Sequence, residues 1–131
     1  MIVVDASALV AIAVGEPDAR DLLRVLSNNE SVISQINYVE IGLILISRRR
    51  FLTQQDIDEW LASLRISLVA VDSLGPTALG AYLAYGRGFH PARLNLADCF
   101  AYALAKNLDL PLLFKGADFS QTDITPALQP T

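Results

Sequence analysis

Short apolar runs alternate with helical segments along the whole chain, and this alternation constrains the fold more than any other feature. The runs are rich in leucine and β-branched residues and are too short for typical helices, which is typical of buried strands. They lie at residues 1–5, 31–34, 68–71 and 112–114. Strands separated by helices form parallel sheets. The sequence therefore predicts one α/β domain over residues 1–131, a small parallel β-sheet flanked by α-helices.

Helical periodicity and capping patterns place the connecting helices. They are predicted at residues 8–14, 16–27, 36–47, 53–64, 77–85 and 95–107. The third of these helices is apolar nearly all round apart from Glu40, which predicts that most of its surface is buried. In the second helix, four side chains are expected to face the core: Leu22, Leu23, Val25 and Leu26.

Composition limits the classes of function. No uninterrupted apolar run reaches the roughly 18 residues of a membrane span, and the N-terminus does not resemble a signal peptide. A single cysteine, Cys99, allows no internal disulfide, so a cytoplasmic location is expected. The net charge of −4 argues against a protein that grips nucleic acid by bulk positive charge. An acidic site that binds a metal ion, and through it phosphate, remains compatible with this charge.

Four acidic residues fall where a parallel sheet would gather them. Asp5 ends the first strand, and Asp118 lies just beyond the last one. Asp98 lies in the first turn of the last helix, and Glu40 is the lone charge of its helix. Because ligands bind beyond the carboxyl ends of parallel strands, these acids are expected to meet. Carboxylates held together repel one another unless a hard cation lies between them, which indicates Mg²⁺ or Mn²⁺ rather than zinc.

Each acid also has a local explanation. Asp98 would complete a helix cap with Asn95, and the two strand-end acids would be turn residues. Glu40 would reach solvent or pair with Arg48, because a lone buried glutamate needs a partner. One shared site explains all four positions together, and we therefore favour it over four separate explanations.

These residues carry a resemblance to a known family. The segments are IVVDASA around Asp5, NYVEI around Glu40, LNLADCFAYALAK around Asp98 and LLFKGADFSQTDI around Asp118. In order and spacing they resemble the four acids of the PIN domain, and most closely the VapC-type toxin ribonucleases of bacterial toxin–antitoxin pairs. The resemblance covers the chain from residue 1 to about residue 124. It implies a PIN-like fold, RNA cleavage with Mg²⁺ or Mn²⁺, a homodimer and a small cognate antitoxin protein.

The resemblance also implies roles for individual residues. It assigns Asp5, Glu40, Asp98 and Asp118 to a catalytic metal site. Ser7 would orient Asp5 or a water molecule, and Asn95 would do the same for Asp98 or only cap its helix. The implied reaction is attack by water on an RNA phosphodiester, which leaves a 5′-phosphate and a 3′-hydroxyl. Whether one or two ions take part stays open.

The loop before the last helix supplies the expected contacts to RNA. Arg87, His90 and Arg93 would guide the strand to the acidic site, although a plain solvated loop explains them equally well. The arginines at 48–50 would belong to the same rim or only complement a helix end. Three aromatic residues are available for base stacking, and core packing is preferred for the last of them: Tyr38, Phe89 and Trp60.

Some positions depart from the commoner family pattern. Leu96 and Ala97 stand where Phe-Gly is frequent, Asn37 stands where a hydroxyl residue is common, and Ala117 often has a polar counterpart. None of these changes removes an acid. They leave open the shape of the substrate groove and the identity of the residues that support the metal ligands.

Two other functions fit parts of the sequence. A signalling receiver domain also uses a small parallel sheet and an acidic Mg²⁺ pocket, with Asp5, Asp72 and Lys115 in its key positions. That assignment lacks the paired acids expected after the first strand and leaves Glu40 and Asp98 unexplained. A catalytically inactive PIN-fold interaction module is the second alternative, and four intact acids argue against it.

Overall fold

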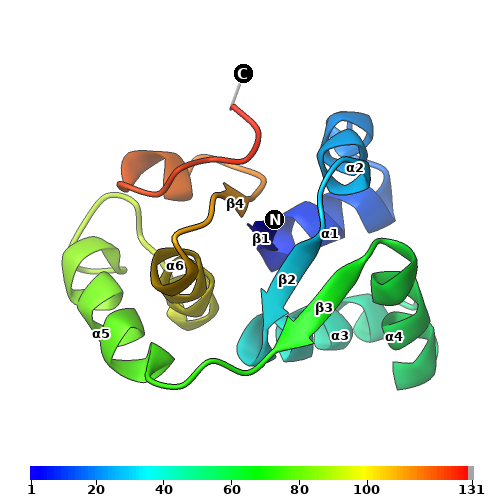
Figure 1. The fold of residues 1–131 in the computed structure, drawn as a ribbon, viewed down its shortest axis with the longest axis horizontal. Helices are drawn as coiled ribbons and strands as arrows, with labels where there is room; N and C mark the ends of the chain where they lie inside the picture. Colours follow the sequence, from blue (N-terminus) through cyan, green and yellow to red (C-terminus); the bar gives the residue numbers. More distant parts are fainter. Residues whose placement is uncertain (130–131) are drawn as a thin grey trace.

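The computed structural model describes residues 1–129 and shows a four-stranded parallel sheet with helices on both faces (Figure 1). The sheet order is β3-β2-β1-β4, so the first strand lies in the middle and the last one at an edge. The strands are β1 Ile2–Val4, β2 Ser31–Ser34, β3 Ile66–Val69 and β4 Leu112–Leu113. The predicted α/β class and parallel sheet are confirmed. The last two residues of the predicted domain, 130–131, lie outside the described residues.

Six α-helices and one short 3₁₀ helix connect and cover these strands within residues 1–129. They are α1 Ala6–Val14, α2 Ala19–Ser27, α3 Gln35–Ser47, α4 Gln54–Ser63, α5 Leu74–Tyr85, α6 Leu96–Leu108 and η1 Phe119–Gln121. In Figure 1, α5 and α6 lie on one side of the sheet, and α1 to α4 lie on the other. All six predicted helices are present, with ends that differ by a few residues.

Alternate strand residues build two separate cores, as the two-residue period of a strand requires. Val3 and Val32 point toward α5 and α6, where Leu104 and Phe119 are also buried. Their neighbours along the strands point the other way, toward α1 to α4: Ile2, Val4 and Ile33. Strands buried on both faces explain the mean hydropathy of +0.39, high for so short a chain.

Local sequence sets the helix ends that matter for the site. Asp5 follows β1 directly and caps α1 with its side chain, so α1 starts at residue 6 and not at the predicted residue 8. Gly15 ends that helix in the left-handed conformation, with φ of 74°, which costs glycine little. At α6, Asn95 and Asp98 form a capping box that fixes where this helix begins.

The prediction for the third strand was wrong in position and in burial. It covers Ile66–Val69, not residues 68–71, and Leu68 is 45% exposed. Two features account for the difference. Arg65 has a φ of 58° and turns the chain out of α4, so pairing with β2 begins earlier. The strand also lies at the sheet edge, where its outer residues meet solvent.

Two predictions of helix burial were also wrong. Leu23 on α2 is 39% exposed, whereas Leu22 and Leu26 are fully buried. On α3, Val39 is 54% exposed and Leu43 67% exposed, so this apolar helix presents one side to solvent. Neither α3 nor any other helix within residues 1–129 is long and apolar enough to cross a membrane.

Candidate active site at the carboxyl end of the sheet

The structure places the four acids around the carboxyl ends of the two adjacent strands β1 and β4. Asp5 follows β1, and Asp118 follows β4 and precedes η1. Asp98 lies in the first turn of α6, and Glu40 lies on α3. The electrostatic influence of one acid on another links all four: Glu40 acts on Asp5, Asp5 and Asp118 act on Asp98, and Asp98 acts on Glu40. The predicted acids therefore share one region.

Asp5 is the most buried of the acids, with 2% of its surface exposed. Its Oδ2 accepts the backbone N–H of Ser7 at 3.0 Å. Its Oδ1 is also buried, and no group in residues 1–129 donates a hydrogen bond to it. Burial, assisted by the charge of Glu40, raises the pKa of Asp5 to about 6. A carboxylate oxygen left without a donor suits coordination of a cation.

Asp98 is half-buried and combines a capping role with a perturbed charge. Its backbone N–H donates to Oδ1 of Asn95 at 2.8 Å, and its Oδ2 accepts the backbone N–H of Asn95 at 3.0 Å. Burial raises the pKa of Asp98 to about 6, with the charge of Asp5 adding to the effect and Arg87 acting in the opposite direction. The local explanation of this pair as a helix cap is confirmed. The cap occupies Oδ2 of Asp98 and does not exclude a second role for the carboxylate.

Glu40 is half-buried, and burial raises its pKa, with the charge of Asp98 adding to the effect. Its Oε1 accepts a long hydrogen bond of 3.5 Å from Nδ2 of Asn37. Within the described residues it forms no ion pair with Arg48, so that local explanation is wrong. The remaining explanations are contact with solvent and a shared site with the other acids.

Asp118 lies in an exposed loop, and its side chain does not cap η1. The loop itself is anchored. The backbone N–H of Lys115 donates to Oγ of Ser7 at 3.0 Å, across 108 residues of sequence. Ser7 therefore contacts Asp5 through its backbone and the Asp118 loop through its hydroxyl. This is more than the sequence predicted for Ser7, because one residue supports two of the acids.

The acids do not form a closed metal site by themselves. Across residues 1–129, no three histidine, cysteine, aspartate or glutamate side chains meet as a metal-binding group. Like charges repel, and three of the four carboxylates accept hydrogen bonds from their own helix or its N-cap: Asp5, Asp98 and Glu40. The donor set nevertheless fits a hard cation: oxygen ligands only, one buried oxygen without a donor, and two pKa values raised to about 6.

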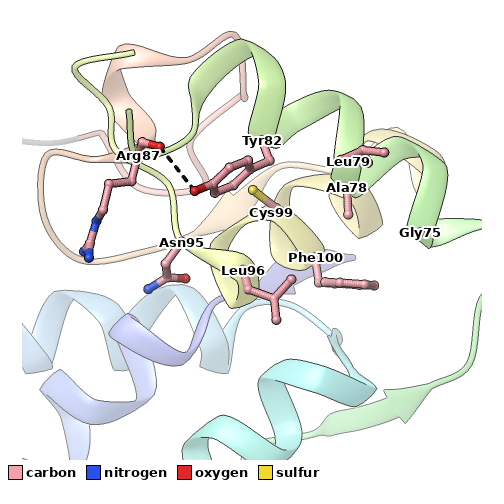
Figure 2. Close-up of a pocket in the computed structure, with 9 residues that line it drawn as sticks. All are labelled: Gly75, Ala78, Leu79, Tyr82, Arg87, Asn95, Leu96, Cys99 and Phe100. Atoms are coloured by element: carbon pink, nitrogen blue, oxygen red, sulfur yellow. Dashed lines mark hydrogen bonds between the residues drawn. The ribbon is translucent and has the colours of Figure 1, made fainter. Parts of the chain in front are cut away.

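An apolar cavity of about 540 Å³ opens between α5 and the N-terminal end of α6 (Figure 2). Figure 2 shows Tyr82 and Leu79 on the α5 wall and Cys99 and Phe100 on the α6 wall, with Arg87 at one end. The hydroxyl of Tyr82 donates to the backbone oxygen of Arg87 at 3.2 Å and holds this end of the loop. Arg87 is exposed, and its charge acts against the rise in the pKa of Asp98.

The other predicted RNA contacts have different surroundings. Nδ1 of His90 accepts the backbone N–H of Ala92 at 3.0 Å, and its ring packs edge-on against Tyr85. His90 therefore serves the loop's own structure through that nitrogen. Arg93 is exposed and adopts a left-handed conformation, with φ of 56°.

Trp60 packs against another ring, as expected: its centroid lies 5.2 Å from that of Phe51. Tyr38 is occupied as well, because its hydroxyl donates to Asp58 at 2.6 Å. Phe89 packs edge-on with Tyr82, with ring centroids 5.7 Å apart, and 60% of its surface is exposed and open to a ligand.

Asp5, Asp72 and Lys115 do not form the phosphoacceptor pocket of a receiver domain in the described residues. Lys115 pairs with Glu16 at 3.1 Å and Asp18 at 3.0 Å, both from the segment between α1 and α2. Asp72 is exposed after the edge strand β3, and β2 separates that strand from β1, which precedes Asp5. The three residues of a phosphoacceptor pocket therefore do not converge.

Asn37 is a site residue whose role the sequence did not predict. It is fully buried on α3, and its amide nitrogen reaches both Glu40 and the backbone oxygen of Ala97. A polar residue one helical turn before a lone glutamate, in a helix that is otherwise apolar, was the available signal. Its second contact, 60 residues away in sequence, was not visible there.

Comparison with known proteins identifies the family. The family model described as the PIN domain matches residues 2–124. Ribonuclease VapC30 of Mycobacterium tuberculosis is 42% identical over 130 residues, which cover 98% of this chain and 99% of the relative. Ribonuclease VapC42 of the same species is 45% identical over 128 residues, covering 95% and 98% of the two chains. Similarity therefore extends over nearly the whole length of these relatives.

Solved structures share the fold at low sequence identity. Mycobacterium tuberculosis VapC20, described as a sarcin–ricin loop cleaving toxin, matches with a TM-score of 0.76 at 16% identity, over 99% of this chain and 100% of that one. A toxin–antitoxin complex from Klebsiella pneumoniae matches with a TM-score of 0.70 at 16% identity, over 94% and 93%. The family model, the full-length relatives and the shared fold agree. The chain therefore belongs to the PIN domain family, as a VapC-type member.

Proposed function

We propose that this protein is an Mg²⁺- or Mn²⁺-dependent endoribonuclease that hydrolyses RNA phosphodiester bonds as the toxin of a toxin–antitoxin pair. The proposal rests on the state of Asp5. Its carboxylate is buried, one of its oxygens has no hydrogen-bond donor, and it interacts electrostatically with Glu40 and Asp98. Such a group is costly in the metal-free protein and becomes favourable beside a divalent cation. The names of the full-length relatives, which are ribonucleases, support the same activity.

Each residue of the site has a proposed role that follows from its position. Asp5, Glu40, Asp98 and Asp118 would hold the cation, which when bound polarises a phosphate oxygen and an attacking water. Ser7 keeps the carboxylate of Asp5 and the loop of Asp118 in fixed relation. Exposed Arg87 would hold the RNA backbone beside them, with Arg93 farther along the loop and His90 shaping it.

The proposed partners are an RNA substrate, a cognate antitoxin protein and a second copy of this chain, all in the cytoplasm. Exposed apolar side chains on two helices support the homodimer. They are Val39 and Leu43 on α3 and Leu79 and Leu83 on α5, each more than half exposed. A hollow lined by Ile36, Leu74 and Phe100, among others, joins the two helices. Exposed apolar patches of this kind mark protein interfaces. The Klebsiella pneumoniae structure that shares this fold is a toxin–antitoxin complex, which supports the antitoxin.

A cleavage assay tests the activity. Purified protein is incubated with mixed single-stranded and folded RNAs in Mg²⁺, in Mn²⁺ and in EDTA, and the product ends are identified. We expect cleavage with either metal, 5′-phosphate products, and loss of cleavage in EDTA. Asp98→Asn should be inactive, and Asp72→Asn, which changes an exposed aspartate outside the site, should match the wild type. Cleavage that persists in EDTA or in Asp98→Asn would show that the site is misassigned.

Growth tests the toxin role separately. Expression of the chain alone in bacteria should arrest growth, and Asp5→Asn or Asp98→Asn should relieve the arrest. An active nuclease that leaves growth unchanged would contradict the toxin role without contradicting the chemistry. A folded protein that binds a partner but cleaves no RNA would instead support the inactive interaction module.

A further inference from the structure

The fully buried amide of Asn37 is an unusual feature of α3. None of its surface is exposed, although the helix around it consists mainly of isoleucine, leucine and valine. A buried amide is costly unless its donors and acceptor are satisfied. The bonds that Asn37 makes therefore show what holds it there.

The carbonyl oxygen of the Asn37 amide is bonded at the N-terminus of α3. The hydroxyl of Ser34, the N-cap of α3, donates to Oδ1 of Asn37, and the backbone N–H of Asn37 donates to Oγ of Ser34 at 3.1 Å. This reciprocal pair satisfies the carbonyl oxygen of the Asn37 amide. Its nitrogen must then point away from Ser34, toward acceptors.

The nitrogen of Asn37 meets two acceptors on two helices. Nδ2 donates to the backbone oxygen of Ala97 at 3.1 Å and, more weakly, to Oε1 of Glu40 at 3.5 Å. Ala97 lies in the first turn of α6 and directly precedes Asp98. One atom therefore contacts one acid directly and the backbone beside another.

No other side-chain hydrogen bond in residues 1–129 joins α3 to α6. The Asn95–Asp98 capping box lies entirely at the N-terminus of α6 and makes no hydrogen bond to α3. Apolar packing between the helices allows sliding more readily than a directed hydrogen bond does. The distance between the carboxylates of Glu40 and Asp98 thus depends on Asn37 more than on any other polar contact.

We propose that Asn37 is a positioning residue that sets the spacing of Glu40 and Asp98 for a divalent cation. This inference rests on the proposed function, because it assumes that both acids hold the ion. Asn37 does not touch the reacting atoms. It acts through the two acids, and groups that orient ligands in this way change metal affinity by about 10- to 100-fold when removed.

If the role of Asn37 is purely structural, a different effect on stability and metal affinity is expected. If the residue only caps α3, its loss would lower thermal stability and leave the metal affinity of the folded protein unchanged. Ser34→Ala separates the two roles, because it removes the capping bond and retains both acceptors of Nδ2. Asn29→Ala is a matched control, since the Asn29 side chain donates to the backbone oxygen of Val25 on α2, away from the acids.

The experiment measures Mn²⁺ binding to the full chain by calorimetry, without RNA. We expect Asn37→Ala to bind Mn²⁺ about 10-fold or more weakly than the wild type. Ser34→Ala should melt at a lower temperature but bind within about twofold, and Asn29→Ala should also bind within that range. Asn37→Thr restores one donor, so its affinity should lie between those of Asn37→Ala and the wild type. Asn37→Val, whose side chain has no donor, is the test variant if Asn37→Ala does not fold.

Two outcomes separate this inference from the proposed function. If Asp98→Asn abolishes Mn²⁺ binding while folded Asn37→Ala, or Asn37→Val in its place, binds as the wild type does, Asn37 has no positioning role and the metal site stands. If the wild type and Asp98→Asn bind Mn²⁺ equally, the metal site is misassigned and both proposals are overturned.

Discussion

Ser7 satisfies one carboxylate oxygen of Asp5 and leaves the other without a partner. The backbone N–H of Ser7 donates to Oδ2 at 3.0 Å, and no donor within residues 1–129 reaches the buried Oδ1. The charged form of Asp5 is therefore under-solvated, and its pKa rises to about 6. The metal-free protein is destabilised by its own site, and this cost can be measured.

The first prediction is that Asp5→Asn stabilises the metal-free protein at neutral pH. The pKa of Asp5 is about 6 in the folded state and 3.8 as its ordinary value. Between these values the folded chain holds a proton that the unfolded chain has released, so stability falls as pH rises through that window and stays low above it. A shift of about two units corresponds to about 3 kcal/mol as an upper bound, and we expect a gain of about 1–3 kcal/mol.

Urea unfolding in EDTA measures this gain. At pH 7.5 the Asp5→Asn protein should have the higher free energy of unfolding, and at pH 4 the two proteins should be nearly equal. Asp72→Asn, at an exposed position, should match the wild type at both pH values. Destabilisation of Asp5→Asn at pH 7.5 would contradict the unsatisfied carboxylate.

The second prediction concerns metal addition. Mn²⁺ at about 100 times its dissociation constant should stabilise the wild type by about 2.7 kcal/mol, because the ion binds the folded state. The effect should fade as pH drops below about 6, where protons compete for Asp5 and Asp98. Thermal melts with and without Mn²⁺ measure it. Asp98→Asn should lose the response and Asp72→Asn should keep it; an equal response in both would exclude Asp98 as a ligand.

The parts of the fold that depend on neighbouring residues were predictable from sequence. Strand and helix order follows from local periodicity, and the Asn95–Asp98 cap is a contact across three residues. The gathering of Asp5 and Asp118 was also predictable, because parallel strands bring their carboxyl ends to one edge. These inferences need no knowledge of distant contacts.

What depends on distant contacts was not predictable. The strand β3 begins early because Arg65 turns the chain with a positive φ, and Leu68 is exposed because its strand lies at an edge. Composition does not indicate which strand lies at the edge. The role of Asn37 depends on Ala97, which the sequence places 60 residues away. Leu43 is exposed on an apolar helix because nothing in residues 1–129 covers it.

The third prediction tests the contact of Arg87 with RNA. Its guanidinium is exposed and close enough to lower the pKa of Asp98, so it would lie beside a phosphate bound at the acids. Arg87→Ala should weaken RNA binding uniformly across sequences and reduce the slope of log affinity against log salt by about one. Fluorescence titration of Asp98→Asn protein, which leaves the RNA uncut, measures both.

Arg20→Ala is the matched control for that measurement, because Arg20 is exposed on α2, away from the acids. It should leave affinity and salt slope unchanged. Equal losses in the two variants would indicate that RNA binding depends only on net charge and not on a contact at the site.

The fourth prediction concerns the apolar surface of α3 and α5. If a second copy of the chain covers it, a carboxylate introduced there becomes buried without a partner, which costs several kcal/mol. Leu43→Asp or Leu83→Asp should therefore weaken dimerisation by about 100-fold or more, about 3 kcal/mol, as measured by sedimentation. Leu52→Asp is the matched control, since Leu52 is 78% exposed and precedes α4 outside this surface. Circular dichroism should show all three variants folded. Dimers of unchanged affinity in Leu43→Asp and Leu83→Asp would exclude this surface as the interface, because no dimer can bury those charges at so small a cost.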